Sequence, residues 1–204
     1  MITATYKQHM GNDLMVVNAA RVSFAKESAM FSDKDAGLIS YLAKHNHKSP
    51  FNHTGATFHV KAPIFVARQL VKHEYMPWNE VSRRYVDDEP EFYTPDVWRG
   101  RSADKKQGSE GVVNDVKIGD ITLTAKVLYN SLIDRGVCPE QARMVLPQST
   151  MTEWYWSGSL DALADMCNLR CTGDTQLETR LVANQICDKM RELFPVSWLA
   201  LRGL

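Results

Sequence analysis

At two places in this sequence, a short run of β-forming residues is followed directly by an apolar helical pattern. This alternation limits the fold to one in which strands and helices pack together. Residues 56–61 predict a strand, and residues 63–73 predict a helix with one apolar face. Residues 150–157 predict a second strand before a helix at 160–168. A chain of 204 residues is long enough to bury its own core. We therefore expect one α+β domain that spans residues 1–204.

The other patterns predict further helices, one more strand and a long loop. Residues 13–24 are apolar with small side chains and predict a strand followed by a helix. Residues 76–111 are rich in Pro, Gly, Asp and Arg, which predicts a long functional loop. Pro195 is expected to end the last helix. The remaining predicted helices cover residues 33–45, 121–135, 139–146 and 175–193.

The charge of the chain is balanced, with 24 Lys and Arg residues against 24 Asp and Glu residues. This balance argues against a general electrostatic attraction to nucleic acid or to an anionic membrane, so any anionic ligand must be held by a local cluster. The sequence has no apolar run of about 18 to 20 residues that could span a bilayer, and its N-terminus lacks the order of a signal peptide. We therefore expect a cytoplasmic protein without nucleic-acid or membrane partners.

The four cysteines are irregularly spaced, and in a reducing compartment they are expected to be free thiols. Cys167 and Cys171 are four residues apart, but no further cysteine pair or His-x3-His motif completes a zinc site. We therefore expect no metal site and expect both thiols to face the core. No Gly-x-Gly-x-x-Gly motif, P-loop or Gly-x-Ser-x-Gly motif supports a Rossmann, kinase-like or serine hydrolase site.

Many hydrogen-bond donors are concentrated just past one predicted helix end, in residues 68–74 and 79–85. Arginine side chains can bind oxygens in a bidentate manner, and Gln or Glu can bind the edges of a polar ring. Such a cluster can hold a phosphate and a planar polar ring together. The alternative is a solvated basic loop with Ser82 as a capping residue.

Two arginines, Arg143 and Arg170, occur where the surrounding pattern is apolar. A buried arginine needs an anionic or carbonyl partner, which could be a ligand or an internal ion pair with Glu153 or Glu178. The histidines around the segment KSPF form either a histidine-rich turn or part of a site; they are His47 and His53.

These segments occur in the order found in flavin-dependent thymidylate synthases, and the chain resembles that family. The early segments similar to the family are VVNAARVSFAKES, KSPFNH and FHVKAPIFVARQ. The family signature is usually Arg-His-Arg and, after a gap, Asn-Glu-x-Ser-x-Arg-Tyr; it matches Lys72-His73-Glu74 and NEVSRRY. The likeness continues through EFYTPDVWR, KKQGS, ARMVLPQST, EWYW and NLR, so it covers most of the chain.

The resemblance implies an α+β fold with a mixed or antiparallel sheet packed with helices, in a homotetramer whose active sites lie between subunits. It implies a methyltransferase of nucleotide biosynthesis that converts dUMP to dTMP. The implied cofactor is FAD, with methylenetetrahydrofolate as carbon donor and NADPH as reductant. Reduced flavin would supply the hydride, so no cysteine nucleophile is implied.

The resemblance also implies roles for particular residues. Arg170 would be the catalytic residue, because it would face the uracil ring and stabilise developing negative charge. The residues implied to line the dUMP site are Gln69, Lys72, Glu80, Val81, Ser82, Arg83, Arg84, Arg143 and Arg170. Those implied to bind FAD are Ser49, Lys72, His73, Glu74, Glu80, Ser159, Leu160, Asp161 and Asp165, with His47 near the flavin and the folate.

The sequence departs from the family pattern at several positions. Lys72 loses the bidentate capacity of an arginine, and Glu74 places a carboxylate where the family has a second arginine. Ser159 and Asp165 stand where many members have Asn, and residues 172–176 replace the usual Asp-x-His-Ala-Gln. Two alternatives therefore remain open. One is a related enzyme that forms another C5 product such as hydroxymethyl-dUMP, and the other is a non-catalytic relative that binds nucleotide or flavin.

Overall fold

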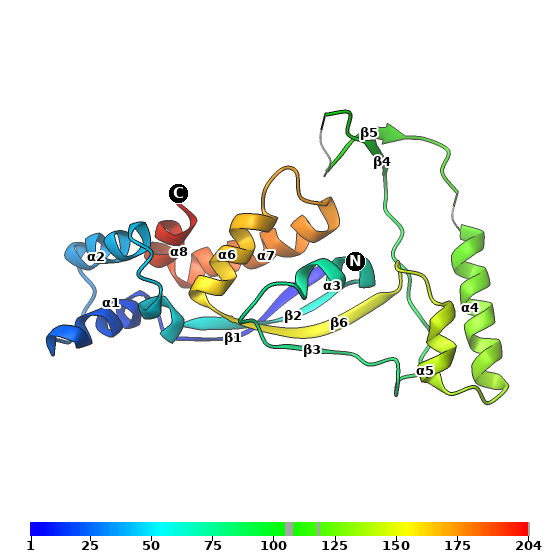
Figure 1. Cartoon of the computed structure of the whole chain (residues 1–204), viewed down its shortest axis with the longest axis horizontal. Helices are drawn as coiled ribbons and strands as arrows, with labels where there is room; N and C mark the ends of the chain where they lie inside the picture. The colour runs from blue at the N-terminus through cyan, green and yellow to red at the C-terminus, as the bar shows by residue number, and fades with distance from the viewer. Residues whose placement is uncertain (105–107, 118, 204) are drawn as a thin grey trace.

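The computed structural model describes residues 1–104, 108–117 and 119–203, and it shows an elongated α+β chain with one main sheet (Figure 1). Residues 105–107 of the KKQGS segment lie outside the described residues. The four strands of the main sheet are β1 (Thr3–Met10), β2 (Gly55–Pro63), β6 (Met151–Ser159) and β3 (Trp78–Glu80). The α-helices are α1 (Asp13–Arg21), α2 (Asp33–Lys44), α3 (Ile64–Leu70), α4 (Gly119–Asp134), α5 (Pro139–Ala142), α6 (Leu160–Arg170), α7 (Leu177–Leu193) and α8 (Pro195–Arg202).

The main sheet has the strand order β1-β2-β6-β3, and each neighbouring pair is antiparallel. The expected α+β class is confirmed, with an antiparallel main sheet. Its register places Phe58 opposite Trp156, and Trp156 opposite Trp78. The side chains of Phe58, Trp154 and Trp156 are buried, so one face of the sheet forms the centre of the core.

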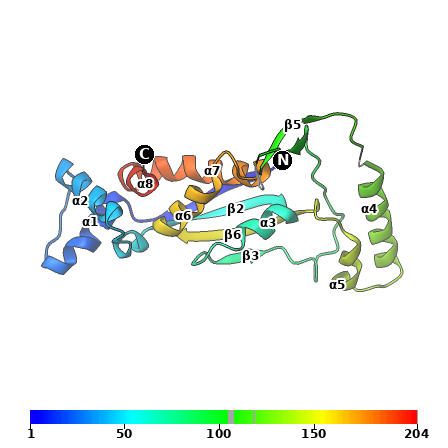
Figure 2. The same cartoon turned by 45° about the horizontal axis from the view of Figure 1, so that its top comes forward.

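Within the described residues, helices cover only one face of this sheet (Figures 1 and 2). Helices α3, α6 and α7 lie on the same side of it in both views (Figures 1 and 2). The opposite face carries polar and partly exposed residues, among them Thr57, His59 and Tyr155. Tyr155 is 50% exposed although it lies in the middle of the sheet. This face is therefore open in the single chain.

The segment 13–24, which was expected to be a strand and a helix, is helical throughout as α1 and the 3-10 helix η1 (Val22–Phe24). The helix begins here because the Asn12 side chain accepts a hydrogen bond from Met15 N at 3.0 Å. Helix α7 ends at Leu193, just before Pro195 as expected, but the expectation that it is the last helix is wrong, because Pro195 begins α8. The carboxylate of Asp13 accepts hydrogen bonds from the first free N–H groups of α8, at 3.0 Å and 2.9 Å.

The region 76–111, expected to be a long loop, contains β3, β4 (Trp98–Arg101) and the first half of β5 (Ser109–Val113). Strands β4 and β5 pair as a separate antiparallel hairpin. Strand β1 was not predicted, and it forms an edge of the main sheet. The other strands and helices agree with their predictions within a few residues, except that residues 139–146 form the short α5 and the 3-10 helix η3 (Arg143–Val145).

Helices α4 and α5 form an arm that extends away from the sheet (Figure 2). Helix α4 packs against α5 and η3, and it exposes several apolar side chains to solvent. These are Ile121, Leu123, Val127 and Leu128, which are 46% to 65% exposed. Among the described residues, no helix has the length and apolar character needed to cross a membrane.

Candidate active site

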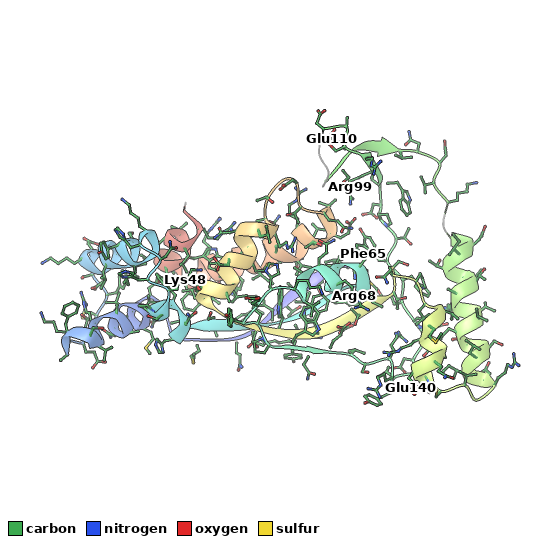
Figure 3. The ribbon with its side chains drawn as sticks, in the orientation of Figure 1. Lys48, Phe65, Arg68, Arg99, Glu110 and Glu140 are labelled. Carbon is green, nitrogen blue, oxygen red and sulfur yellow. The ribbon has the colours of Figure 1, made fainter. Side chains whose placement is uncertain are left out.

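Three pockets surround α3 and the turn that follows it. Helix α3 continues directly from β2, with Pro63 in extended conformation at its N-cap, and its inner face is buried through Val66, Ala67 and Leu70. The helix thereby turns Arg68 and Gln69 toward different pockets. Figure 3 shows Arg68 on α3, Lys48 beside α6, and Arg99 in the β4 to β5 hairpin.

The first pocket, here called the signature-loop pocket, has a volume of about 720 Å³. It lies between α3, β3 with the loop after it, β6 and η3. The predicted dUMP-site residues that line it are Glu80, Val81, Ser82, Arg83 and Arg143. Arg68 adds a further positive charge to its wall, whereas Lys61 is paired with Glu91 and Glu153. The wall also carries acidic residues, so the donors that it offers to an anionic ligand are its arginines and Ser82.

Hydrogen bonds fix the signature loop in place. The Glu80 carboxylate accepts from Thr152 Oγ1 at 2.8 Å and from Trp78 Nε1 at 3.0 Å. Ser82 begins a turn, because its carbonyl accepts from Tyr85 N at 3.0 Å and its hydroxyl accepts from Arg84 N at 3.3 Å. The loop therefore presents its side chains from a backbone that is already ordered.

The two arginines of the signature are anchored to the arm and to the loop itself. Arg83 donates to Asp88 O at 2.9 Å and lies over the ring of Tyr129 from α4, 5.9 Å from its centroid. Arg84 is exposed and lies 3.6 Å from Glu140 of α5. An exposed pair of this kind contributes little to stability, so Arg84 is available to a ligand.

The second pocket, here called the Arg170 pocket, has a volume of about 680 Å³ and contains Gln69 and Arg170. Gln69 donates to the Gln176 side chain through Nε2 and accepts from Thr179 Oγ1 at 3.0 Å. Arg99 also lines this pocket and forms an ion pair with buried Glu178 at 2.8 Å.

Arg170 is positioned by His73. The Nε of Arg170 donates to His73 Nε2 at 3.1 Å, which requires that this ring nitrogen carries no proton. Burial and the charge of Arg170 lower the pKa of His73 to about 4, so the imidazole is neutral at physiological pH. The bond uses Nε of Arg170 and leaves its terminal nitrogens for a ligand.

The third pocket, here called the Lys48 pocket, has a volume of about 780 Å³. The predicted FAD residues that line it are Lys72, His73, Glu74, Ser159, Asp161 and Asp165. It lies at the start of α6, where the Ser159 hydroxyl accepts from Ala162 N at 3.3 Å. The structure therefore brings together residues that are up to 93 positions apart, from Lys72 to Asp165.

Lys48 joins the two acidic residues of this pocket. Its Nζ lies 2.7 Å from Asp165 and 3.1 Å from Asp161. The bond to Asp165 raises the pKa of Lys48, whereas burial raises the pKa of the Asp161 carboxyl. The Oδ1 atom of Asp161 is buried and has no hydrogen bond among the described residues, in spite of the nearby ammonium.

Four of the predicted FAD residues lie apart from the walls of the Lys48 pocket. His47 is exposed next to the rings of Tyr41 and His45. Ser49 is exposed at the start of the 3-10 helix η2 (Ser49–His53). Leu160 is fully buried, and its N–H binds Thr54 O at 2.9 Å. Glu80 belongs to the signature-loop pocket instead.

The predicted dUMP residues are divided between pockets within one chain. Gln69 and Arg170 line the Arg170 pocket, Lys72 lines the Lys48 pocket, and most others line the signature-loop pocket. Arg143 is exposed, and its Nε donates to Glu140 O at 3.3 Å, so the expectation of a buried side chain is wrong for this arginine.

The two acids considered as internal partners of these arginines pair with other residues instead. Glu153 pairs with His59 at 3.1 Å and with Lys61 at 3.5 Å. Glu178 pairs with Arg99, and Tyr93 donates to the same carboxylate at 3.2 Å. Because both acids already have partners, neither accounts for Arg143 or Arg170.

Sequence reasoning missed Lys48 and Arg99, whereas Arg68 belongs to the predicted donor cluster of residues 68–74. Lys48 lies between His47 and Ser49, which were both selected, but its two acidic partners follow more than 110 residues later. Arg99 lies in the region that was taken as loop, and only the hairpin and α7 bring it to Glu178. The spacing of charges along the sequence carries no signal for such long-range pairs.

The fold and the three pockets define an α+β protein with polar binding pockets grouped around one short helix. The sequence model of the family described as thymidylate synthase complementing protein matches residues 6–196. The chain therefore belongs to this family, as its motifs led us to expect.

Relatives and solved structures agree with this assignment. The chain is 41% identical over 197 residues to a flavin-dependent thymidylate synthase of Thermus thermophilus, and the match covers 94% of this chain and 72% of the relative. It is 39% identical over 199 residues to the flavin-dependent thymidylate synthase of Thermosipho africanus, covering 91% of this chain and 84% of the relative. It also resembles the crystal structure of the UMP/dUMP methylase PolB from Streptomyces cacaoi bound with 5-Br dUMP. That likeness has a TM-score of 0.89 and 32% identity, and it covers 100% of this chain and 96% of the other.

Proposed function

We propose that this protein is a flavin-dependent thymidylate synthase that converts dUMP to dTMP, with methylenetetrahydrofolate as carbon donor and NADPH as reductant. The observation that carries the proposal is the hydrogen bond between His73 and Arg170, which joins the signature motif to the NLR motif. It is supported by relatives named flavin-dependent thymidylate synthase that match more than nine-tenths of the chain.

The dUMP site would combine charge and hydrogen bonding. Arg83 and Arg143 of the signature-loop pocket and the exposed Arg84 would bind the phosphate, with Ser82 as a further donor. Arg170, held by His73, would direct its terminal nitrogens at the uracil ring and stabilise negative charge as it develops. Gln69, already fixed by Thr179, would bind the polar edge of the ring. The protein would thus contribute to the reaction mainly by positioning the substrate.

The residues of the Lys48 pocket fit a flavin nucleotide. The buried Oδ1 of Asp161 is paired with the Lys48 ammonium at 3.1 Å but accepts no hydrogen bond among the described residues, and a hydroxyl or N–H group of the cofactor would supply one. Lys48, Lys72 and Ser159 supply donors, and Lys48 pairs with both aspartates but offsets the charge of only one of them. FAD bound there would supply the hydride. Glu74 would weaken binding of the pyrophosphate by repulsion.

The complete site would be assembled between subunits of a homotetramer. Two observations support this. The predicted dUMP residues are divided between pockets within one chain, and the arm exposes a row of apolar side chains on α4. Apolar patches of this kind are typical of interfaces between protein subunits.

The experiment that tests the proposed function is product analysis by mass spectrometry. The purified protein is incubated with FAD, NADPH, methylenetetrahydrofolate and dUMP, and we expect dTMP. The matched variant is Arg170→Ala, which should raise the activation barrier by roughly 3 to 4 kcal/mol. Turnover should therefore fall by about two to three powers of ten, while dUMP still binds. Absence of any C5 product with the wild-type protein, or unchanged turnover in the variant, contradicts the proposal.

A second candidate is a relative that modifies the C5 position of another substrate or forms another product. The observation that favours it is the similarity over the whole chain to a UMP/dUMP methylase, together with the altered signature Lys72-His73-Glu74. The same assay decides between the two when UMP is offered beside dUMP. Preferred conversion of UMP, or a hydroxymethyl product, supports the second candidate.

A further inference from the structure

Three of the four cysteines meet where α6, α7 and α8 pack together. The sulfur atoms of Cys167, Cys171 and Cys187 all lie within 4.8 Å of one another. Cys167 lies in the last turns of α6, Cys171 is one helical turn later at the C-cap of that helix, and Cys187 comes from α7. Cys167 is fully buried, Cys187 is 6% exposed, and Cys171 reaches the surface. Sequence spacing showed only the pair on α6.

Two buried donors next to this thiol cluster have no acceptor. The Nε1 of Trp198 and the Nε of Arg202 are buried and form no hydrogen bond within the described part of the chain. Both side chains come from α8, which packs against α6 and α7, and Nη1 of Arg202 donates to Oδ1 of Asn168, the residue after Cys167, at 2.6 Å. Neutral thiols are weak acceptors, whereas thiolates and metal-bound thiolates accept hydrogen bonds well. The surroundings therefore fit a cluster that carries negative charge.

We propose that Cys167, Cys171 and Cys187 form a binding site for one Zn²⁺ ion. Zinc binds thiolate sulfur at about 2.3 Å, so three sulfurs that already lie together need only a small contraction. Three thiolates and one Zn²⁺ leave a single negative charge, which Arg202 offsets. The fourth ligand would come from solvent on the side of Cys171, which is partly exposed.

Binding would release three protons, one from each thiol. One of them is the proton that Cys167 donates to Ala183 O at 3.6 Å in the metal-free chain. A disulfide between two of the cysteines would leave the Trp198 and Arg202 donors without an anionic acceptor. A metal site accounts for these donors, and a disulfide or simple packing does not.

The metal site would also help to position the proposed catalytic residue, Arg170. Arg170 directly precedes Cys171, so a zinc ion that joins Cys171 to α7 would fix the end of α6. This effect is a positioning role and depends on the proposed function, whereas the metal site itself does not.

The test is a calorimetric titration of the reduced full-length protein with Zn²⁺, after treatment with a chelator and without FAD. We expect one equivalent to bind, with proton release that is shown by repeating the titration in buffers of different ionisation enthalpy. Cys187→Ala and Cys171→Ser should each lower the affinity at least tenfold. The control Cys138→Ser, which changes the exposed cysteine on the arm, should bind as the wild type does.

Several outcomes would overturn the proposal. They are the absence of stoichiometric binding by the wild type, equal binding by Cys171→Ser, and a disulfide among the three cysteines in protein purified under reductant. If circular dichroism shows that Cys187→Ala does not fold, the affinity of Cys171→Ser for Zn²⁺ serves as the test. This variant should fold, because the Cys171 side chain is partly exposed. None of these measurements uses enzyme activity, so failure of the metal site and failure of the proposed function remain distinguishable.

Discussion

At the scale of single residues, the function depends on contacts between side chains that are far apart in sequence. His73 and Arg170 are separated by 97 positions, yet one hydrogen bond joins them between the Lys48 pocket and the Arg170 pocket. The bond exists only while His73 Nε2 is unprotonated. The protonation of one imidazole therefore controls the orientation of the proposed catalytic arginine.

The first prediction concerns the pH dependence of this pair. The pKa of His73 is lowered from 6.5 to about 4, so the neutral form is favoured in the folded chain. Its contribution to stability is therefore fully present above pH 6.5 and is lost as the pH falls toward about 4. His73→Gln keeps an acceptor that does not titrate. We expect the wild type to lose on the order of 1 to 2 kcal/mol relative to this variant over that range, after solvent screening.

Urea unfolding of both proteins at pH 7 and at pH 4.5 measures this difference. His73→Ala is the companion variant, because it removes the acceptor at every pH. It should lower turnover at pH 7, while His73→Gln retains most of it. Parallel stability curves for the wild type and His73→Gln would show that His73 does not titrate in this range.

The second prediction concerns Glu74, which is exposed and lines the Lys48 pocket. Glu74→Arg should tighten FAD binding, because repulsion of the cofactor phosphates is replaced by attraction. A change of about 1 kcal/mol corresponds to roughly fivefold in Kd. Fluorescence titration with FAD measures it, and Glu27→Arg makes the same charge change away from the three pockets. Equal affinity in both variants would mean that FAD phosphates lie away from Glu74.

At the scale of helices and strands, the sequence predicts the interior elements better than the ends. Strands β2 and β6 and helices α2, α3, α6 and α7 follow from periodicity, because each places one regular apolar face on the core. Strand β1 lies at an edge and has mostly exposed side chains, so its pattern is weak. Helix α8 begins at a proline whose cap comes from a residue more than 180 positions earlier.

The sequence predicts most residues of the candidate site but not the contacts between them that join different helices. The motifs selected most residues that line the Lys48 pocket and the signature-loop pocket. They did not show Lys48 as the partner of Asp161 and Asp165, nor Cys187 beside Cys167. Such contacts depend on which helices pack together, and periodicity within one element does not determine that.

The third prediction concerns the cap of α8. Asp13 is buried to 8% exposure and accepts two backbone hydrogen bonds from the first turn of that helix. Asp13→Ala removes both acceptors and should lower the stability by about 2 kcal/mol, which corresponds to a Tm decrease of roughly 4 to 8 °C. Asp33→Ala is the control, because it removes an exposed carboxylate from the first turn of α2. Equal Tm decreases in the two variants would contradict the capping role.

At the scale of the whole molecule, two surfaces are incomplete in a single chain. In the part of the chain that the structure describes, no helix covers one face of the main sheet, and the arm extends from the other elements with apolar residues exposed (Figures 1 and 2). Arg83 lies over Tyr129 of α4, so the position of the arm also affects the signature loop. A subunit interface at the arm would therefore affect the position of Arg83 in the signature-loop pocket.

The last prediction is that this arm forms a subunit interface of a homotetramer. Leu123 is 61% exposed on α4, so a glutamate there is well solvated in a free chain and does little to the fold. In an assembled interface the same carboxylate would be buried without a partner, which is strongly unfavourable. We therefore expect light scattering to give four times the 23.1 kDa of one chain for the wild type and a smaller assembly for Leu123→Glu. Asn184→Glu adds a carboxylate to an exposed position on α7 and should keep the wild-type mass. An unchanged mass for Leu123→Glu would show that α4 is not an interface, and a wild-type mass of one chain would require the divided nucleotide site to close within one subunit.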